Sequence, residues 1–180
     1  MIQAPEPIVI HTTRCTIRPL DDADIDAVMA YRNDTEWMRY QGLKGLDCQG
    51  YIDRLIGNGF DLETGGQLAI IEDATHTLIG DLYVNIAPPQ CRIGFTISPE
   101  HARQGYGFEA TSGLIDALAS LPGITVLMAD AHPDNVASIS LLEKLGFIQV
   151  GTNDDSVSYE LTQGHATPDA NRCVAGTSNP

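Results

Sequence analysis

The chain is poor in basic residues, and this shortage limits its partners. Its 180 residues include ten Lys and Arg against 24 Asp and Glu, for a formal net charge of −14 at pH 7. The only lysines are Lys44 and Lys144. Because such a surface repels a phosphate backbone, general nucleic-acid binding is disfavoured. Solubility is the simplest explanation of the charge, although an acidic surface also attracts a cationic acceptor such as an amine.

Clustered cysteines and long apolar runs are absent as well. The four cysteines, Cys15, Cys48, Cys91 and Cys173, form no Cys-x-x-Cys pair and no group with histidine, so neither a disulfide framework nor a metal site is expected. This usage suits a reducing compartment, and we expect a cytoplasmic protein. No apolar run reaches the roughly 18 residues that span a bilayer. Residues 1–10 lack the pattern of a secretory signal, so no membrane partner is expected.

Length and composition predict one folded domain. A chain of 180 residues with 43% hydrophobic residues is long enough to bury one core. We expect this domain to cover residues 1–162. The sequence of residues 163–180 is polar, small and without periodicity, which is typical of a mobile tail.

The spacing of apolar residues predicts a mixed α/β fold. A strand at 13–19 is followed by expected helices at 21–32 and 47–56. Three strand-like runs with short turns then indicate an antiparallel meander, after which helices and strands alternate. The meander strands are expected at 67–72, 78–86 and 91–97, and the later elements at 105–120 (helix), 124–130 (strand), 133–145 (helix), 147–151 (strand) and 156–161 (strand).

A glycine loop stands directly before the helix expected at 105–120. Gly105 and Gly107 allow a tight turn and the close approach of a ligand to the backbone. The first amides of a helix have no internal partners, and the helix dipole is positive at this end, so the loop predicts a phosphate site. Arg103 could add a charge-assisted hydrogen bond.

The same loop also fits a dinucleotide-binding fingerprint. It reads Gly-x-Gly-x-x-Ala through Ala110, and Asp130 follows about 20 residues later at a strand end. That motif needs its first glycine directly after a strand, whereas residues 98–104 intervene here. It also needs further βα units, for which the remaining chain is short. The dinucleotide alternative is therefore disfavoured.

Three segments in order resemble the GNAT acetyltransferase superfamily, and the resemblance covers residues 13 to about 161. They are Ile93-Gly94-Phe95-Thr96-Ile97-Ser98-Pro99-Glu100, Gln104-Gly105-Tyr106-Gly107-Phe108-Glu109-Ala110, and Asn135-Val136-Ala137-Ser138 with Leu142-Glu143-Lys144-Leu145-Gly146-Phe147. The opening Thr16-Ile17-Arg18-Pro19-Leu20, with Asp21 and Asp24, is similar to the branch that acetylates ribosomal-protein N-termini. The chain departs from the family at Ala102, where Arg or Gln is usual, with Arg103 one step later.

The resemblance implies a central, mostly antiparallel sheet that is splayed at the acyl-CoA site and flanked by about four helices. It further implies that acetyl-CoA, as co-substrate, transfers its acetyl group directly to a neutral amine. The pantetheine arm would lie along Phe95, Thr96 and Ile97. The pyrophosphate would bind the amides of Arg103, Gln104, Gly105, Tyr106, Gly107 and Phe108, and Asn135 would help to hold the arm. Family members often pair, which leaves a homodimer open.

The groups that would move protons are less well marked. Many family members carry a tyrosine that protonates the departing thiolate at the position of Leu142, so that role is missing here. Ser138 is the replacement that the resembled branch suggests, although a helical serine can also bond the carbonyl one turn back. Asp81 is the candidate base, although a lone Asp on a strand is more often solvated. Asn135 could equally be a helix cap.

Other residues and other functions stay open. Glu36, near Trp37 and Tyr40, could line an acceptor pocket or be an ordinary charge at a helix end. His101, near the glycine loop, is expected to face solvent, and His132 is expected in a loop. The leading function is an N-acetyltransferase acting on a protein N-terminus or small amine. A non-catalytic acyl-CoA-binding or regulatory module on the same fold is the alternative, and modification of a toxin or an antibiotic is a third.

Overall fold

The computed structural model describes residues 8–57 and 59–162. The mobile tail that the sequence predicts at 163–180 lies outside these residues, as does Cys173. The strands are β1 (Ile10–His11), β2 (Cys15–Pro19), β3 (Gly65–Glu72), β4 (Thr77–Ala87), β5 (Gln90–Ile97), β6 (Val126–Ala131), β7 (Ile148–Thr152) and β8 (Val157–Thr162). The helices are α1 (Ile25–Arg32), α2 (Cys48–Tyr51), α3 (Tyr106–Ala119) and α4 (Val136–Lys144), with 3₁₀ turns at Asp22–Asp24 and Pro99–His101 and a π-helical turn at Ile52–Ile56.

The strands form one sheet in the order β1-β2-β3-β4-β5-β6-β8-β7. All neighbouring pairs are antiparallel except β5 and β6, which are parallel and joined by α3. The predicted mixed α/β class, the meander and the mostly antiparallel sheet are thereby confirmed. Two residues of β1 are too few to show an alternating pattern, which explains why the sequence did not indicate this strand.

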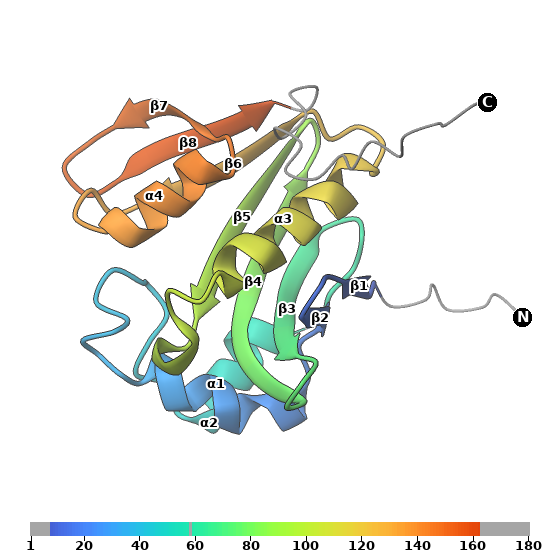
Figure 1. Ribbon diagram of the computed structural model, residues 1–180, viewed down its shortest axis with the longest axis vertical. Coiled ribbons are helices and arrows are strands. Elements are labelled where there is room, and N and C mark those ends of the chain that lie inside the picture. The colour runs from blue at the N-terminus through green and yellow to red at the C-terminus, as the bar shows by residue number, and fades with distance from the viewer. Residues whose placement is uncertain (1–7, 58, 163–180) are drawn as a thin grey trace, which may run out of the picture.

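Helices cover both faces of the sheet. Helix α3 lies across the front of the sheet in Figure 1. The larger core cluster joins α3 and α4 to the sheet face that carries Leu68 and Ile70. Ala69 points to the opposite face and belongs to a second cluster with residues of α1 and α2. Within the described residues, no helix has the length and apolar character needed to cross a membrane.

The two N-terminal helices are shorter than predicted. Asp21 and Asp24 form a reciprocal capping box, and the first turn after it is 3₁₀ rather than α-helical. Asp47 caps α2 by accepting a hydrogen bond from the Gly50 amide (2.8 Å), but the helix changes to π geometry after Tyr51. Capping residues and apolar spacing therefore predicted where these helices lie, but not whether each turn is α-, 3₁₀- or π-helical.

Candidate active site

The sheet opens at its centre, between β5 and β6. These strands pair over only three residues each, and they diverge beyond that point (Figure 1). The Ser98 amide donates to the Ile79 carbonyl of β4 at 2.8 Å. Because successive residues of a strand point their backbone groups to opposite sides, the amides and carbonyls of Phe95 and Ile97 face the opening. The sheet thus presents a free strand edge there.

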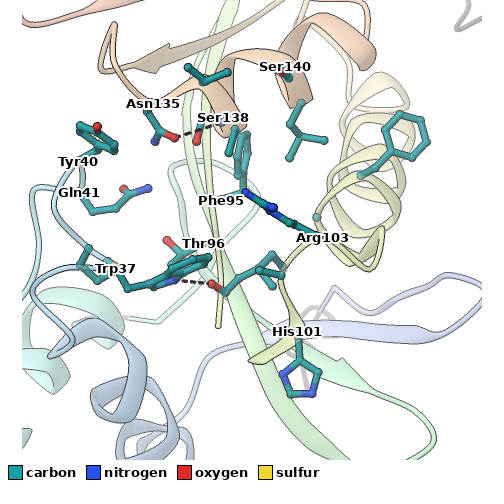
Figure 2. A pocket seen from close by; sticks show the side chains of 18 of the residues that line it. Trp37, Tyr40, Gln41, Phe95, Thr96, His101, Arg103, Asn135, Ser138 and Ser140 are labelled. Carbon is teal, nitrogen blue, oxygen red and sulfur yellow. Dashed lines mark hydrogen bonds between the residues drawn. The ribbon is translucent and has the colours of Figure 1, made fainter. Parts of the chain in front are cut away.

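A cleft of about 640 Å³ lies along this free edge. Its walls come from β5, from the loop before α3, from α4 and from residues 37–41 (Figure 2). The predicted site residues that line it are Phe95, Thr96, Ile97, Arg103, Gly105, Gly107, Phe108, Asn135 and Ser138. The structure therefore brings together residues that lie up to 43 positions apart in the sequence.

The glycine loop supplies one wall of the cleft with unpaired amides. Gly105 has a left-handed backbone (φ 85°) and directly precedes α3. No hydrogen bond joins the amides of residues 103–108 to another described residue. A Cβ on Gly107 would lie 3.2 Å from Leu141 Cδ2 and 3.5 Å from Ile97 Cγ1, so a side chain there would narrow the cleft. The arrangement suits an anion at a helix N-terminus.

Three of the predicted cofactor-binding residues meet the cleft differently from the others. The Gln104 side chain folds back to the Glu100 carbonyl (2.9 Å), and Tyr106 is buried away from the cleft, so only their amides are available to a ligand there. Thr96 pairs with Asp81 of β4, so its backbone faces away from the free edge while its side chain lines the cleft. A ligand arm along β5 would accordingly pair with Phe95 and Ile97.

Helix α4 begins at the far wall of the cleft. Asn135 caps the helix by accepting a hydrogen bond from the Ser138 amide at 3.2 Å, and its side chain also lines the cleft (Figure 2). The cap and the ligand-facing position thus occur together. The Ser138 hydroxyl has no hydrogen-bond partner among the described residues, so it does not bond the carbonyl one turn back. Leu142, where many family members have tyrosine, is buried in the core.

Asp81 lies outside the cleft, in a buried polar cluster on the α1 face of the sheet. Arg32 holds both of its oxygens, with Nη2 to Oδ1 at 2.6 Å and Nε to Oδ2 at 3.1 Å, and Tyr31 and Gln67 also donate to it. Burial, followed by the adjacent carboxylate, raises the pKa of Tyr31, so this phenol stays a donor. The general-base role of Asp81 stays a prediction. Its contacts favour a structural role, in which Asp81 acts as an anchor that holds Arg32 in place.

Hydrogen bonds of Arg32 extend this buried cluster to the segment of residues 33–47, of which residues 37–41 form the wall opposite the glycine loop. Arg32 Nη1 also donates to the Leu43 carbonyl at 3.0 Å. Trp37 Nε1 donates to the Ile97 carbonyl at 2.9 Å, at the free edge of β5 (Figure 2). Trp37 and Tyr40 line the cleft, whereas Glu36 is exposed and does not. The predicted pocket lining therefore holds for the aromatic neighbours of Glu36 rather than for Glu36 itself.

Lys144 is a cleft residue that the sequence analysis did not single out. Its Nζ lies 4.5 Å from the centroid of the Phe108 ring, and it lines the cleft together with Leu141 and Ser140. The spacing of three and four residues along α4 places these side chains on one helical face, which was the available signal. Lys144 therefore adds a positive charge close to the glycine loop.

A second cavity of about 240 Å³ adjoins the first. The two share Tyr40, Gln41, Phe95, Asn135 and Ser138, so they meet beside the free edge of β5. The ring of His132 stacks on Tyr40 at 4.9 Å at this cavity. Its lining also includes Asp130, which is paired with Arg92, and Asp155. His101 lines the larger cleft, where its ring bonds Ser98 Oγ at 2.8 Å and points away from the other labelled side chains (Figure 2).

A splayed sheet with a phosphate-type loop and a free strand edge defines an acyl-CoA-dependent acetyltransferase, and comparison with known proteins agrees. A family model described as "Acetyltransferase (GNAT) domain" matches residues 14–148. The uncharacterized N-acetyltransferase YoaA of Bacillus subtilis (strain 168) is 30% identical over 149 residues, which cover 79% of this chain and 84% of that relative. The chain belongs to the GNAT acetyltransferase family.

Solved structures share this fold at low sequence identity. The spermidine N-acetyltransferase from Vibrio cholerae, in complex with CoA and spermine, has a TM-score of 0.70 and 17% identity, covering 84% of this chain and 96% of that chain. The ribosomal-protein-S5-alanine acetyltransferase from Vibrio fischeri has a TM-score of 0.71 and 16% identity, covering 88% and 98%. The predicted family and acetyl-CoA dependence are confirmed, and the dinucleotide alternative is wrong.

Proposed function

We propose that this acetyltransferase transfers the acetyl group of acetyl-CoA to a primary amine, either a protein N-terminus or a small amine, in the cytoplasm. The observation that carries this proposal is the meeting of two cavities at Ser138 and Phe95. The larger cavity has the glycine loop and the free strand edge that suit acetyl-CoA. The smaller one opens beside them and leaves room for an acceptor to approach the same point.

In the proposed donor site, the pantetheine arm pairs with the backbone of Phe95 and Ile97 as an added strand would. The pyrophosphate lies at the amides of residues 103–108, where the dipole of α3 and the charges of Arg103 and Lys144 favour it. One amide at the free edge stabilises the oxyanion that develops on the thioester. The donor is thereby held with its carbonyl carbon toward the second cavity.

The reaction is a direct acyl transfer. The amine nitrogen attacks the thioester carbon, the carbon–sulfur bond then breaks, and the amine loses one proton while the thiolate gains one. Ser138 donates its hydroxyl proton to the thiolate and regains a proton from the amine, so protons balance. Holding the amine in line with the thioester supplies much of the rate enhancement.

The acceptor is proposed to approach as a cation and to release one proton to water, so that it attacks as the neutral amine. Asp155 at the second cavity, and the net charge of −14, favour the approach of a protonated amine. Structural neighbours are named for spermidine and for a ribosomal protein. Polyamines and peptides with free N-termini are therefore the first acceptors to test.

The test is a thiol-release assay with acetyl-CoA and a panel of polyamines, N-terminal peptides and aminoglycosides. We expect CoA release that depends on one acceptor class, together with a mass increase of one acetyl group on that acceptor. Binding of acetyl-CoA without acceptor-dependent release for any amine would contradict the proposal and favour a non-catalytic module.

A further inference from the structure

The glycine loop is held from behind by a residue that lies far away in the sequence. Arg14 stands just before β2, which contacts α3. Its Nη1 donates to the Gln104 carbonyl at 3.1 Å, and its guanidinium lies 4.1 Å above the Tyr106 ring. Arg14 does not line the cleft, so it grips the face of the loop that points away from the ligand.

This grip sets the direction of one amide. In a trans peptide the carbonyl and the following N–H point to opposite sides. The Gln104 carbonyl points to Arg14, so the Gly105 amide points away from Arg14. Because Gly105 lines the cleft, that direction is toward the ligand. A Cβ on Gly105 would lie 3.3 Å from Arg14 Nη2, which shows how closely the guanidinium packs against the loop.

Arg14 also offsets a charge that would disfavour an anion. Glu109 lies in the first turn of α3, and its Oε2 accepts from Arg14 Nε at 2.7 Å, while its Oε1 accepts from the Arg14 amide at 2.6 Å and from Thr12 Oγ1 at 2.7 Å. Burial alone raises the pKa of Glu109, but the hydrogen bonds from Thr12 and Arg14 outweigh it and lower the pKa. The carboxylate is thus negative near the helix N-terminus, where only a cation can neutralise it.

We propose that Arg14 is a positioning residue for the pyrophosphate of acetyl-CoA: it turns the Gly105 amide into the cleft and neutralises Glu109. It acts through the loop rather than by contact with the ligand. This inference rests on the proposed placement of the pyrophosphate at residues 103–108. If Arg14 only tied β2 to α3, its loss would weaken the binding of every ligand to a similar extent and would lower the stability of the fold.

The experiment compares CoA with pantetheine. CoA carries the pyrophosphate and the 3′-phosphoadenosine, whereas pantetheine keeps only the arm expected along β5. Arg14→Gln is titrated with each ligand by ¹H–¹⁵N NMR, which reaches millimolar Kd values and follows the Gly105 amide directly. Arg18→Gln is the matched control, because Arg18 lies in β2 and also pairs with a carboxylate. Its Nη1 and Nη2 donate to Asp24 Oδ2 and Oδ1 at 2.7 and 2.8 Å. Urea unfolding checks each variant.

We expect Arg14→Gln to weaken CoA binding by about tenfold, as for the loss of a charged hydrogen bond, and to remove the CoA-induced shift of the Gly105 amide. Pantetheine binding should stay within about twofold of the parent. Arg14→Lys, which keeps the charge without the two-sided grip, should recover only part of the loss. Arg18→Gln should bind CoA as the parent does.

The experiment distinguishes a wrong placement of the pyrophosphate from a wrong role for Arg14. If the parent binds CoA with no change at residues 103–108, the proposed placement of the pyrophosphate fails, and the inference falls with it. If the parent shows that change but Arg14→Gln binds CoA equally well, or loses CoA and pantetheine in equal measure, only the inference on Arg14 is overturned.

Discussion

The two walls of the cleft are built by different means. The donor wall, formed by the β5 edge, the loop of residues 103–108 and α4, combines apolar side chains with the unpaired amides of the loop and the N-terminus of α3. The opposite wall, residues 33–47, is held by side chains that reach across the fold, from Arg32 to Asp81 and from Trp37 to the Ile97 carbonyl. Mutations should therefore act on the donor wall through ligand binding and on the opposite wall through stability and order.

The largest expected effect is on the anchor of the opposite wall. Asp81→Asn leaves the buried Arg32 guanidinium without its counter-charge, and we expect the free energy of unfolding to fall by about 3 kcal/mol. Urea unfolding measures the loss. Asp130→Asn is the matched control, because the Arg92–Asp130 pair is partly exposed and should contribute less than about 1 kcal/mol. A stable Asp81→Asn protein with a large loss of rate would instead support the base.

Ser138, on the α4 part of the donor wall, lines both cavities, and its removal should affect the chemical step. We expect Ser138→Ala to lower kcat by about 100-fold, since positioned proton transfer typically contributes that much or more, with little change in the Kd of CoA. Acceptor-dependent thiol release measures kcat. Ser112→Ala on α3, which lines neither cavity, should behave as the parent does. Unchanged turnover by Ser138→Ala would remove the serine from the mechanism.

A side chain that narrows the cleft at the donor wall should weaken the binding of CoA without affecting the opposite wall. In Gly107→Val the new side chain meets Leu141 and Ile97 across the cleft, and we expect the Kd for CoA to rise by about tenfold. Calorimetric titration measures the change. Gly42→Ala, on the opposite wall with nothing within 4 Å of the new Cβ, is the control that should bind CoA normally. Equal affinities in the two variants would place CoA elsewhere.

The smallest expected effect comes from Trp37→Phe. The ring is largely kept while the hydrogen bond to the Ile97 carbonyl is lost, which should cost about 1 kcal/mol locally. We expect faster hydrogen exchange across residues 33–47 and, because Trp37 lines the larger cleft and not the second cavity, at most a severalfold change in the Kd of CoA. Equally faster hydrogen exchange in the donor wall would contradict the proposed difference between the two walls.

The same division explains what could be predicted from the sequence. The donor wall depends on short local patterns, such as glycines before a helix and an Asn cap, so Gly105, Gly107 and Asn135 were placed from sequence alone. The opposite wall depends on contacts between residues 49 positions apart in the sequence, as for Arg32 and Asp81. Strand periodicity put Asp81 on a face without saying which groups cover that face. Its buried anchor could therefore not be foreseen.

A crystal structure with acetyl-CoA tests the central claim most directly. We expect hydrogen bonds from pantetheine to the backbone of Phe95 and Ile97, the pyrophosphate at the amides of residues 103–108, and the thioester sulfur beside the Ser138 hydroxyl. A ligand bound outside the opening between β5 and β6, or one whose thioester points away from the second cavity, would contradict it.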